Sequence, residues 1–378
     1  MQMKAVAVTP KQKDSVRLVE MDEPKLESIP AGRGVKVKTL RVGGCGTDRE
    51  INNAEYGIAP EGSDFLVLGH ENLGQVVETG ENVTEFAAGD YVVASVRRPG
   101  HSIYDLIGEQ DMTTDSEYFE RGISRLHGYF AELYVESADF LVKLPPTLKE
   151  VGVLLEPLSI VEKGLQQAYE IQERAKIWKA KRAAVIGTGS VGLLTVMALR
   201  MRGLEVHAFG KDTRAGYKNA DLCEEIGAKY YSTMETPVSE IGKLVGGFDI
   251  ILEATGFSPI VWDAARALAK NGVLILTSVT GGERTAEIAS DKIVFEFVLG
   301  NKLMFGTVNA GKEHFAAGVK DLALCEAMHA DWLDKMLTHP INGIENFRQM
   351  FDNLNGGASG VIKTFCQISE SSIVNRQS

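Results

Sequence analysis

The feature that most constrains the fold is a glycine-rich turn inside a regular alternation of apolar strands and helices. The turn reads Gly187-Thr188-Gly189-Ser190-Val191-Gly192 and directly follows an apolar segment. Parallel strands that are buried on both faces show such apolar runs, and helices connect them. The sequence therefore predicts an α/β fold with a doubly wound parallel sheet, whose strands lie at residues 183–186, 205–209, 248–252 and 272–277.

The glycine turn fits the pattern GxGxxG and predicts a dinucleotide site. Gly187 permits the tight turn, Gly189 lets a pyrophosphate approach the backbone, and Gly192 allows the helix to pack on the strand. Ser190 and Val191 open the helix, whose free N–H groups favour a phosphate. The alternative is a purely structural strand-to-helix turn.

The end of the next strand indicates which dinucleotide is bound. A site for NAD usually has an acidic residue there, which binds the ribose 2′-hydroxyl. This strand continues as Gly210-Lys211-Asp212-Thr213-Arg214, with no acid at Gly210. Lys211 and Arg214 could neutralise a 2′-phosphate, although Asp212 argues the other way and both cations could simply be solvated. We expect NADP to be favoured over NAD.

The first half of the chain is β-rich and carries three candidate metal ligands. Cys45 lies in a glycine-rich turn, His70 ends an apolar strand, and Glu156 follows an apolar run. A buried carboxylate needs a partner or a metal. Thiolate, imidazole and carboxylate together suit zinc, and an open fourth position suits catalysis. The spacing alone does not distinguish this site from three unrelated residues.

Composition and charge limit the partners of the chain. Asp and Glu outnumber Lys and Arg 51 to 40 over 378 residues, which gives a net charge of −11. Such a surface repels nucleic acid and anionic lipid, so we expect neither as a partner. Four cysteines without CxxC spacing form no disulfide framework. No signal peptide or bilayer-spanning stretch is apparent, so a cytoplasmic enzyme or binding protein is expected.

Taken in order, these segments resemble the zinc-containing medium-chain dehydrogenase/reductase superfamily. The shared segments are Gly44-Cys45-Gly46-Thr47-Asp48, Gly69-His70-Glu71, Gly89-Asp90-Tyr91-Val92, Glu156-Pro157 and the GxGxxG turn. Further features are similar to the archaeal-type glucose (aldose) 1-dehydrogenases, namely Arg97-Arg98-Pro99-Gly100, Glu120-Arg121-Gly122-Ile123, Glu253-Ala254-Thr255-Gly256 and Gly306-Thr307-Val308-Asn309.

The resemblance implies two domains and an assembly. A GroES-like catalytic domain would span residues 1–180 and be completed by residues 310–378, and a Rossmann domain that binds NAD or NADP would span residues 181–309. Relatives of this kind imply a homo-oligomer, either a dimer or a tetramer.

The resemblance also implies catalytic roles for individual residues. Cys45, His70 and Glu156 would hold one catalytic zinc, with Glu71 as a ligand or a near neighbour. Thr47 would hydrogen-bond the substrate hydroxyl and begin a proton relay.

Substrate and cofactor residues follow in the same way, with two departures from the family pattern. Glu120 and Asn309 would bind sugar hydroxyls, and Thr255 would contact the cofactor. Many relatives bind a structural zinc through four cysteines in the lobe that here covers residues 101–113; without those cysteines, no structural zinc is expected. Gly300 stands where relatives often have a histidine, which leaves the identity of the sugar open.

The implied reaction is the oxidation of a glucose-like aldose at C1 to its lactone, with a hydride passed to the nicotinamide. A zinc polyol or secondary-alcohol dehydrogenase is an alternative that the motifs do not separate. A different class of alternative is a non-catalytic dinucleotide-binding sensor, which would not need the three candidate zinc ligands.

Overall fold

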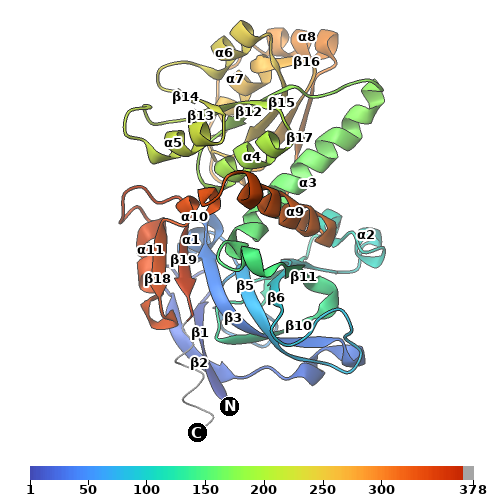
Figure 1. The fold of residues 1–378 in the computed structure, drawn as a ribbon, viewed down its shortest axis with the longest axis vertical. Coiled ribbons are helices and arrows are strands. Elements are labelled where there is room, and N and C mark those ends of the chain that lie inside the picture. The colour runs from blue at the N-terminus through green and yellow to red at the C-terminus, as the bar shows by residue number, and fades with distance from the viewer. Residues whose placement is uncertain (369–378) are drawn as a thin grey trace. The chain divides into compact units, whose positions relative to one another are not determined.

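Two compact units make up the chain in the computed structural model, which describes residues 1–368 (Figure 1). Unit 1 consists of Met1–Ser159, Asn309–Ala323 and Leu333–Ser378, of which 369–378 lie outside the described residues. Unit 2 consists of Ile160–Val308 and Leu324–Trp332. Residues 160–180 and 324–332 therefore belong to unit 2, whereas the predicted catalytic domain included them.

Unit 1 is built on β-sheets, as its β-rich sequence indicates. The largest sheet has the order β11-β6-β5-β3-β19-β18, with β10 paired to β3. Its strands are β3 (Gly34–Gly44), β5 (Glu71–Thr79), β6 (Tyr91–Ala94), β10 (Leu133–Ser137), β11 (Leu141–Leu144), β18 (His339–Asn342) and β19 (Thr364–Gln367). The smaller sheets contain β1 (Gln2–Val8), β2 (Arg17–Asp22) and β4 (Leu66–Val67), and β7 (Arg97–Arg98), β8 (Phe119–Arg121) and β9 (Arg125–Leu126).

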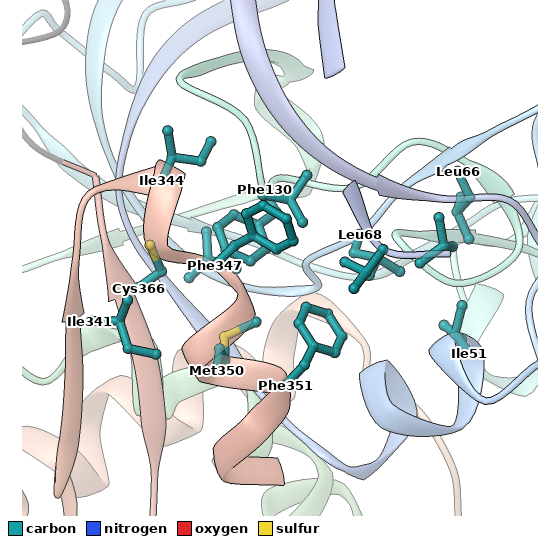
Figure 2. Packing of buried hydrophobic residues seen from close by; sticks show 14 of the residues in the cluster. Ile51, Leu66, Leu68, Phe130, Ile341, Ile344, Phe347, Met350, Phe351 and Cys366 are labelled. Atoms are coloured by element: carbon teal, nitrogen blue, oxygen red, sulfur yellow. The ribbon is translucent and has the colours of Figure 1, made fainter. Parts of the chain in front are cut away.

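The C-terminal part of the chain completes the main sheet of unit 1. Strand β19 pairs antiparallel with β3, so that Thr364 lies opposite Gly44. In the same unit lie α1 (Gly46–Asn52), α2 (Ile103–Leu106) and α11 (Arg348–Leu354). Figure 2 shows how Met350 and Phe351 of α11 pack with Ile51 of α1, Leu68 and Phe130 in one buried apolar cluster. The cluster fixes α1, and with it the turn that carries Cys45.

Unit 2 contains the predicted parallel sheet, which is confirmed. All neighbouring strands in the order β14-β13-β12-β15-β16-β17 are parallel, the order of a doubly wound dinucleotide-binding sheet. The strands are β12 (Arg182–Ile186), β13 (Glu205–Gly210), β14 (Lys229–Ser232), β15 (Phe248–Glu253), β16 (Leu268–Leu276) and β17 (Leu303–Gly306). The edge strands β14 and β17 are absent from the sequence prediction.

Helices connect the parallel strands and link the two units. Unit 2 contains α4 (Ser190–Met201), α5 (Lys218–Glu225), α6 (Val238–Val245), α7 (Ile260–Ala267) and α8 (Ser290–Gly300). Residues of both units form α3 (Leu155–Gln172), α9 (Lys312–Met328) and α10 (Trp332–Met336). Short 3-10 helices lie at Leu26–Ser28, Pro30–Gly32, Gln110–Met112, Ala138–Phe140, Pro146–Leu148, Gly152–Leu154, Glu173–Ala175 and Ile344–Asn346. No helix within residues 1–368 has the length and apolar character needed to span a membrane.

Candidate active site

Three of the predicted metal-site residues meet at one end of the main sheet of unit 1. Cys45 stands between β3 and α1, and its Sγ lies 3.1 Å from Nε2 of His70. Glu71 begins β5 directly after His70. One ligand atom from each of these three residues lies within 4.8 Å of the others. The fold thus brings the Cys45 thiol next to the imidazole and the carboxylate of the adjacent residues His70 and Glu71, 25 positions further along the chain.

Glu156 carries a buried carboxylate that has no protein partner. The residue is in the first turn of α3 and is 7% exposed. Within residues 1–368 no donor or cation bonds to its carboxylate, and burial raises its pKa to about 7, with His70 acting in the opposite direction. A buried carboxylate without a partner is costly, and a bound cation would remove that cost. This observation fits the predicted zinc site.

Lys363 contacts Glu71 and was not identified from the sequence. Its ammonium group lies 2.5 Å from Oε1 of Glu71, also contacts Oε2, and donates to the Gly44 carbonyl at 3.2 Å. Both side chains are almost completely buried. Burial lowers the pKa of Lys363, but the neighbouring Glu71 and Cys45 raise it by more than burial lowers it. The pKa of Lys363 therefore lies above its usual value. Glu71 therefore already has a cation, which favours Glu156 as the metal ligand and Glu71 as its neighbour.

Asp48 lies beside two of the predicted ligands, Cys45 and His70. Its Oδ2 accepts a hydrogen bond from the backbone N–H of Cys45 at 3.0 Å, and its Oδ1 lies 3.8 Å from Nδ1 of His70. Such outer partners orient the ligands of a metal. Thr47, predicted to begin the proton relay, is partly exposed in the first turn of α1, two residues after Cys45.

The two predicted sugar-binding residues also come together, although 189 positions separate them. Glu120 in β8 and Asn309 are both buried, and Nδ2 of Asn309 donates to Oε1 of Glu120. Arg97 in β7 donates to the same oxygen from Nε at 3.1 Å and from Nη2 at 2.7 Å. The guanidinium carbon of Arg97 lies 4.6 Å from the centre of the Tyr118 ring.

The glycine turn of unit 2 has the geometry that a pyrophosphate site requires. Gly187 has φ +99°, a conformation that favours glycine, and a Cβ at Gly192 would overlap the Gly187 carbonyl. Gly189 precedes α4 and faces open space. Ser190 begins that helix, followed by Val191. Thr255, another predicted cofactor residue, binds Oε1 of Glu253 through its N–H at 2.6 Å and its hydroxyl at 2.5 Å.

The packing at the end of β13 explains why position 210 carries glycine and not an acid. A Cβ at Gly210 would lie 2.4 Å from the Tyr230 hydroxyl and 2.7 Å from Oγ1 of Thr188, so a side chain there would require these two side chains to move. Beside it is a cavity of about 450 Å³ lined by Lys211, Asp212, Thr213, Ala215, Gly216, Tyr217 and Met234. Within the described residues, Lys211 has no carboxylate partner. It remains available for a phosphate.

Arg214, the second predicted phosphate-binding cation, is engaged elsewhere. Its guanidinium binds Glu224 at 2.8 and 2.6 Å and Asp221 at 2.9 Å, both on α5. Arg214 would have to leave these carboxylates to reach a phosphate, which the sequence prediction did not include. Its role in cofactor binding therefore remains a prediction.

The cysteine-free lobe is held by hydrogen bonds. Asp105 accepts from the Ser102 and Thr113 hydroxyls at 2.5 and 2.6 Å. Burial raises the pKa of Asp105, but these hydrogen bonds outweigh it and lower the pKa to about 2. At the start of α9, His314 and Glu313 lie near Asp111 of the lobe, a group of possible ligands that sequence spacing did not indicate. Nδ1 of His314 already accepts a hydrogen bond from Gly311 N–H at 2.9 Å.

Comparison with known proteins defines first the class and then the family. Residues 32–146 match the alcohol dehydrogenase GroES-like domain, and residues 149–368 match the glucose dehydrogenase C-terminus. A glucose 1-dehydrogenase of Methanocella arvoryzae is 43% identical over 92% of this chain and 95% of its own length. A solved structure of Haloferax mediterranei glucose dehydrogenase in complex with NADP, Zn and gluconolactone is 36% identical, with a TM-score of 0.86 over 97% of this chain and 99% of that chain. The chain belongs to the glucose dehydrogenase family of the zinc-containing medium-chain dehydrogenase/reductase superfamily.

Proposed function

We propose that this protein oxidises a glucose-like aldose at C1 to its lactone, with zinc as the catalytic metal and NADP favoured over NAD as hydride acceptor. The observation that carries the proposal is the unpartnered, buried carboxylate of Glu156 in the unit that also brings Cys45 and His70 together. The relatives named above are glucose dehydrogenases, and one of them binds NADP, zinc and gluconolactone.

Cys45, His70 and Glu156 would hold the zinc, and Asp48 and Lys363 support the site. A bound zinc supplies Lewis acidity, which lowers the pKa of a substrate hydroxyl. Lys363 donates a hydrogen bond to Glu71 and neutralises its carboxylate. Glu71 can therefore lie next to the zinc ligands without competing for the metal. Asp48 fixes the backbone of Cys45 through a hydrogen bond of 3.0 Å.

The remaining residues bind the sugar and move its proton. Glu120 and Asn309 hold hydroxyl groups of the ring, and Thr47 accepts the proton of the reacting hydroxyl and passes it outward. The substrate carbon then loses its hydrogen as a hydride, and the hydroxyl becomes the lactone carbonyl. Bound NADP supplies the hydride acceptor. The glycine turn at Gly187 holds the pyrophosphate, and Lys211 neutralises the 2′-phosphate.

We also propose that the protein is a homo-oligomer in which two copies meet along β17. This strand is an edge of the parallel sheet, and an unpaired edge is a template for pairing. The adjacent helix α8 exposes four large apolar side chains to at least 60%: Val294, Phe295, Val298 and Leu299. A second copy with the same patch would cover them by two-fold symmetry. Sedimentation of wild type and Phe295→Glu tests this, since only the variant should be monomeric.

The proposed surroundings of the enzyme follow from its thiols and charge. None of the four cysteines, all within residues 1–368, forms a disulfide, which suits a reducing, cytoplasmic compartment. The net charge of −11 disfavours nucleic acid and anionic membranes as partners. The proposed partner is therefore a small, neutral sugar or polyol.

A substrate panel tests the proposed function. We would measure kcat/KM for several aldoses, sorbitol and propanol, each with NADP and with NAD. At least one aldose should exceed sorbitol and propanol. Higher efficiency on sorbitol or propanol than on every aldose would instead indicate a polyol or alcohol dehydrogenase. Dinucleotide binding without turnover of any substrate would indicate a sensor.

A further inference from the structure

We propose that Arg97 is the positioning residue that presents one open carboxylate oxygen of Glu120 to the substrate, and so selects a neutral, hydroxyl-rich ligand. The inference rests on the proposed function, because Glu120 is expected to bind sugar hydroxyls there. It adds a role for Arg97, which contacts Glu120 rather than the substrate.

The hydrogen bonds around Glu120 are all on one oxygen. Arg97 donates twice to Oε1, at 3.1 and 2.7 Å, and Asn309 donates to the same atom. In the part of the chain that the structure describes, Oε2 has no hydrogen-bond partner. Unlike the fully buried polar atoms that lack a partner, it keeps some contact with solvent. Glu120 as a whole is only 4% exposed. One oxygen is therefore saturated, and the other is an unpartnered acceptor at an accessible point.

The surroundings of Arg97 fix this arrangement. The side chain of Arg97 is 8% exposed and that of Glu120 is 5% exposed, so the pair is screened little by water. The Tyr118 ring packs against the guanidinium, and the Tyr118 hydroxyl contacts that of Tyr56. Asn309 has φ +62°, a left-handed conformation that asparagine adopts more readily than most residues. A planar guanidinium with several fixed donors can saturate one oxygen in a way that a lysine ammonium cannot.

The open oxygen sets the chemistry of the ligand. A carboxylate accepts hydrogen bonds only, so Oε2 favours a hydroxyl donor and repels a carboxylate or phosphate group. The positive charge of Arg97 is already paired with Glu120 through Oε1. Arg97 therefore attracts an anionic substrate less than an unpaired arginine would. The geometry therefore favours a neutral aldose over a phosphorylated or acidic sugar.

The neighbouring Arg98 provides a matched control. It lies on the same strand, its side chain is equally buried, and it also binds a buried carboxylate, Glu136, at 2.6 Å. Its other contacts are with Ser95, Tyr129, the Arg97 carbonyl and the Phe140 ring, none of which is a predicted substrate group. Loss of Arg98 should therefore lower stability without selecting between substrates.

The experiment is a kinetic double-mutant cycle with saturating NADP. Glu120→Gln can keep an acceptor toward Arg97 while it replaces the open acceptor by an N–H₂ donor. We would measure kcat, KM and Tm for wild type, Arg97→Met, Arg97→Lys, Arg98→Met, Glu120→Gln and Arg97→Met/Glu120→Gln. The substrates are the best aldose, the same sugar as its 6-phosphate, and propanol.

Loss of a hydrogen bond to a charged group predicts that Arg97→Met raises KM for the aldose about 10- to 100-fold, with a much smaller change in kcat. The effect on propanol should be at least about tenfold smaller, and Arg97→Lys should recover part of the loss. Because Arg97 acts through Glu120, the double variant should be no worse than Glu120→Gln alone. Arg98→Met should lower Tm without this split between substrates.

Two results separate the failure of this inference from that of the proposed function. Suppose that wild type oxidises aldoses. The role of Arg97 is refuted if the changes in KM of the two single variants multiply in the double variant. It is also refuted if Arg97→Met changes the KM for propanol as much as that for the aldose. The same follows if wild type prefers the 6-phosphate to the free sugar. If wild type oxidises no aldose at all, the proposed function fails, and the Arg97 inference fails with it.

Discussion

Replacement of Glu136 by Gln should remove the part of the acid sensitivity of unit 1 that arises from this buried carboxylate. The Glu136 carboxylate is 2% exposed and lies between two arginines, with Oε2 at 2.6 Å from Arg98 and at 2.9 Å from Arg121. The Tyr129 hydroxyl and the Ser137 N–H also donate to it. Burial raises the pKa of Glu136, but the two arginines outweigh this and lower the pKa to about 2.

The magnitude follows from the difference between the folded and unfolded pKa. A pKa of 4.5 in the unfolded chain and about 2 in the folded chain corresponds to about 3 kcal/mol of folding free energy. Because the folded pKa is the lower one, this contribution is complete above pH 4.5 and is lost as the pH falls from 4.5 to about 2. At pH 7, Glu136→Gln leaves two guanidinium groups without their buried counter-ion, a change that costs about 3–5 kcal/mol.

Urea denaturation followed by circular dichroism between pH 3 and 7 measures this effect. Circular dichroism is needed because all three tryptophans, Trp178, Trp262 and Trp332, belong to unit 2. Glu85→Gln is the matched control, since the pKa of Glu85 is also lowered to about 2 by Arg33, but its side chain is 38% exposed. Solvent screens such a pair, so the control should behave like wild type. An unchanged pH dependence in Glu136→Gln, or equal losses in both variants, would refute the reasoning.

Two further predictions concern the metal and the cofactor. Cys45→Ala and Glu156→Gln should each lose zinc and activity while Tm changes little, because a catalytic metal does not hold a large core together; elemental analysis that finds full zinc in both variants would contradict the ligand assignment. Lys211→Ala should lower the NADP-to-NAD ratio of kcat/KM about tenfold, as expected for one charged contact to phosphate. Glu224→Gln should raise the same ratio, because it weakens the hold on Arg214; opposite or absent changes would show that neither cation reads the 2′-phosphate.

Local patterns predicted the parts of the fold that depend on local physics. The glycine turn and the central strands β12, β13, β15 and β16 were predicted because buried parallel strands are continuously apolar. The edge strands β14 and β17 were missed, since each has only four residues and β14 (Lys229–Ser232) alternates exposed and buried positions. The turn at Gly300 was interpreted only as a missing histidine, whereas the structure shows the end of α8, with Asn301 at φ +47°.

Residues that meet only through tertiary pairing could not be predicted in the same way. Lys363 and Glu71 are 292 positions apart in the chain and meet because β19 pairs with β3. No local sequence pattern encodes that register. The pairing of Arg214 with Glu224 could have been predicted more easily from the sequence, because the acidic residues of α5 follow Arg214 within ten positions. The meeting of Glu120 and Asn309 was expected only through the family resemblance.

The most direct test of the central claim is the identity of the product. Purified protein with zinc, NADP and ¹³C1-labelled glucose should convert the C1 signal to that of the lactone and then of the aldonic acid, with one NADPH formed for each sugar consumed. If another aldose reacts faster in the substrate panel, the same conversion at C1 is expected with that sugar. A label that stays at the aldehyde oxidation level while NADPH accumulates would place the oxidation at another carbon and contradict the account.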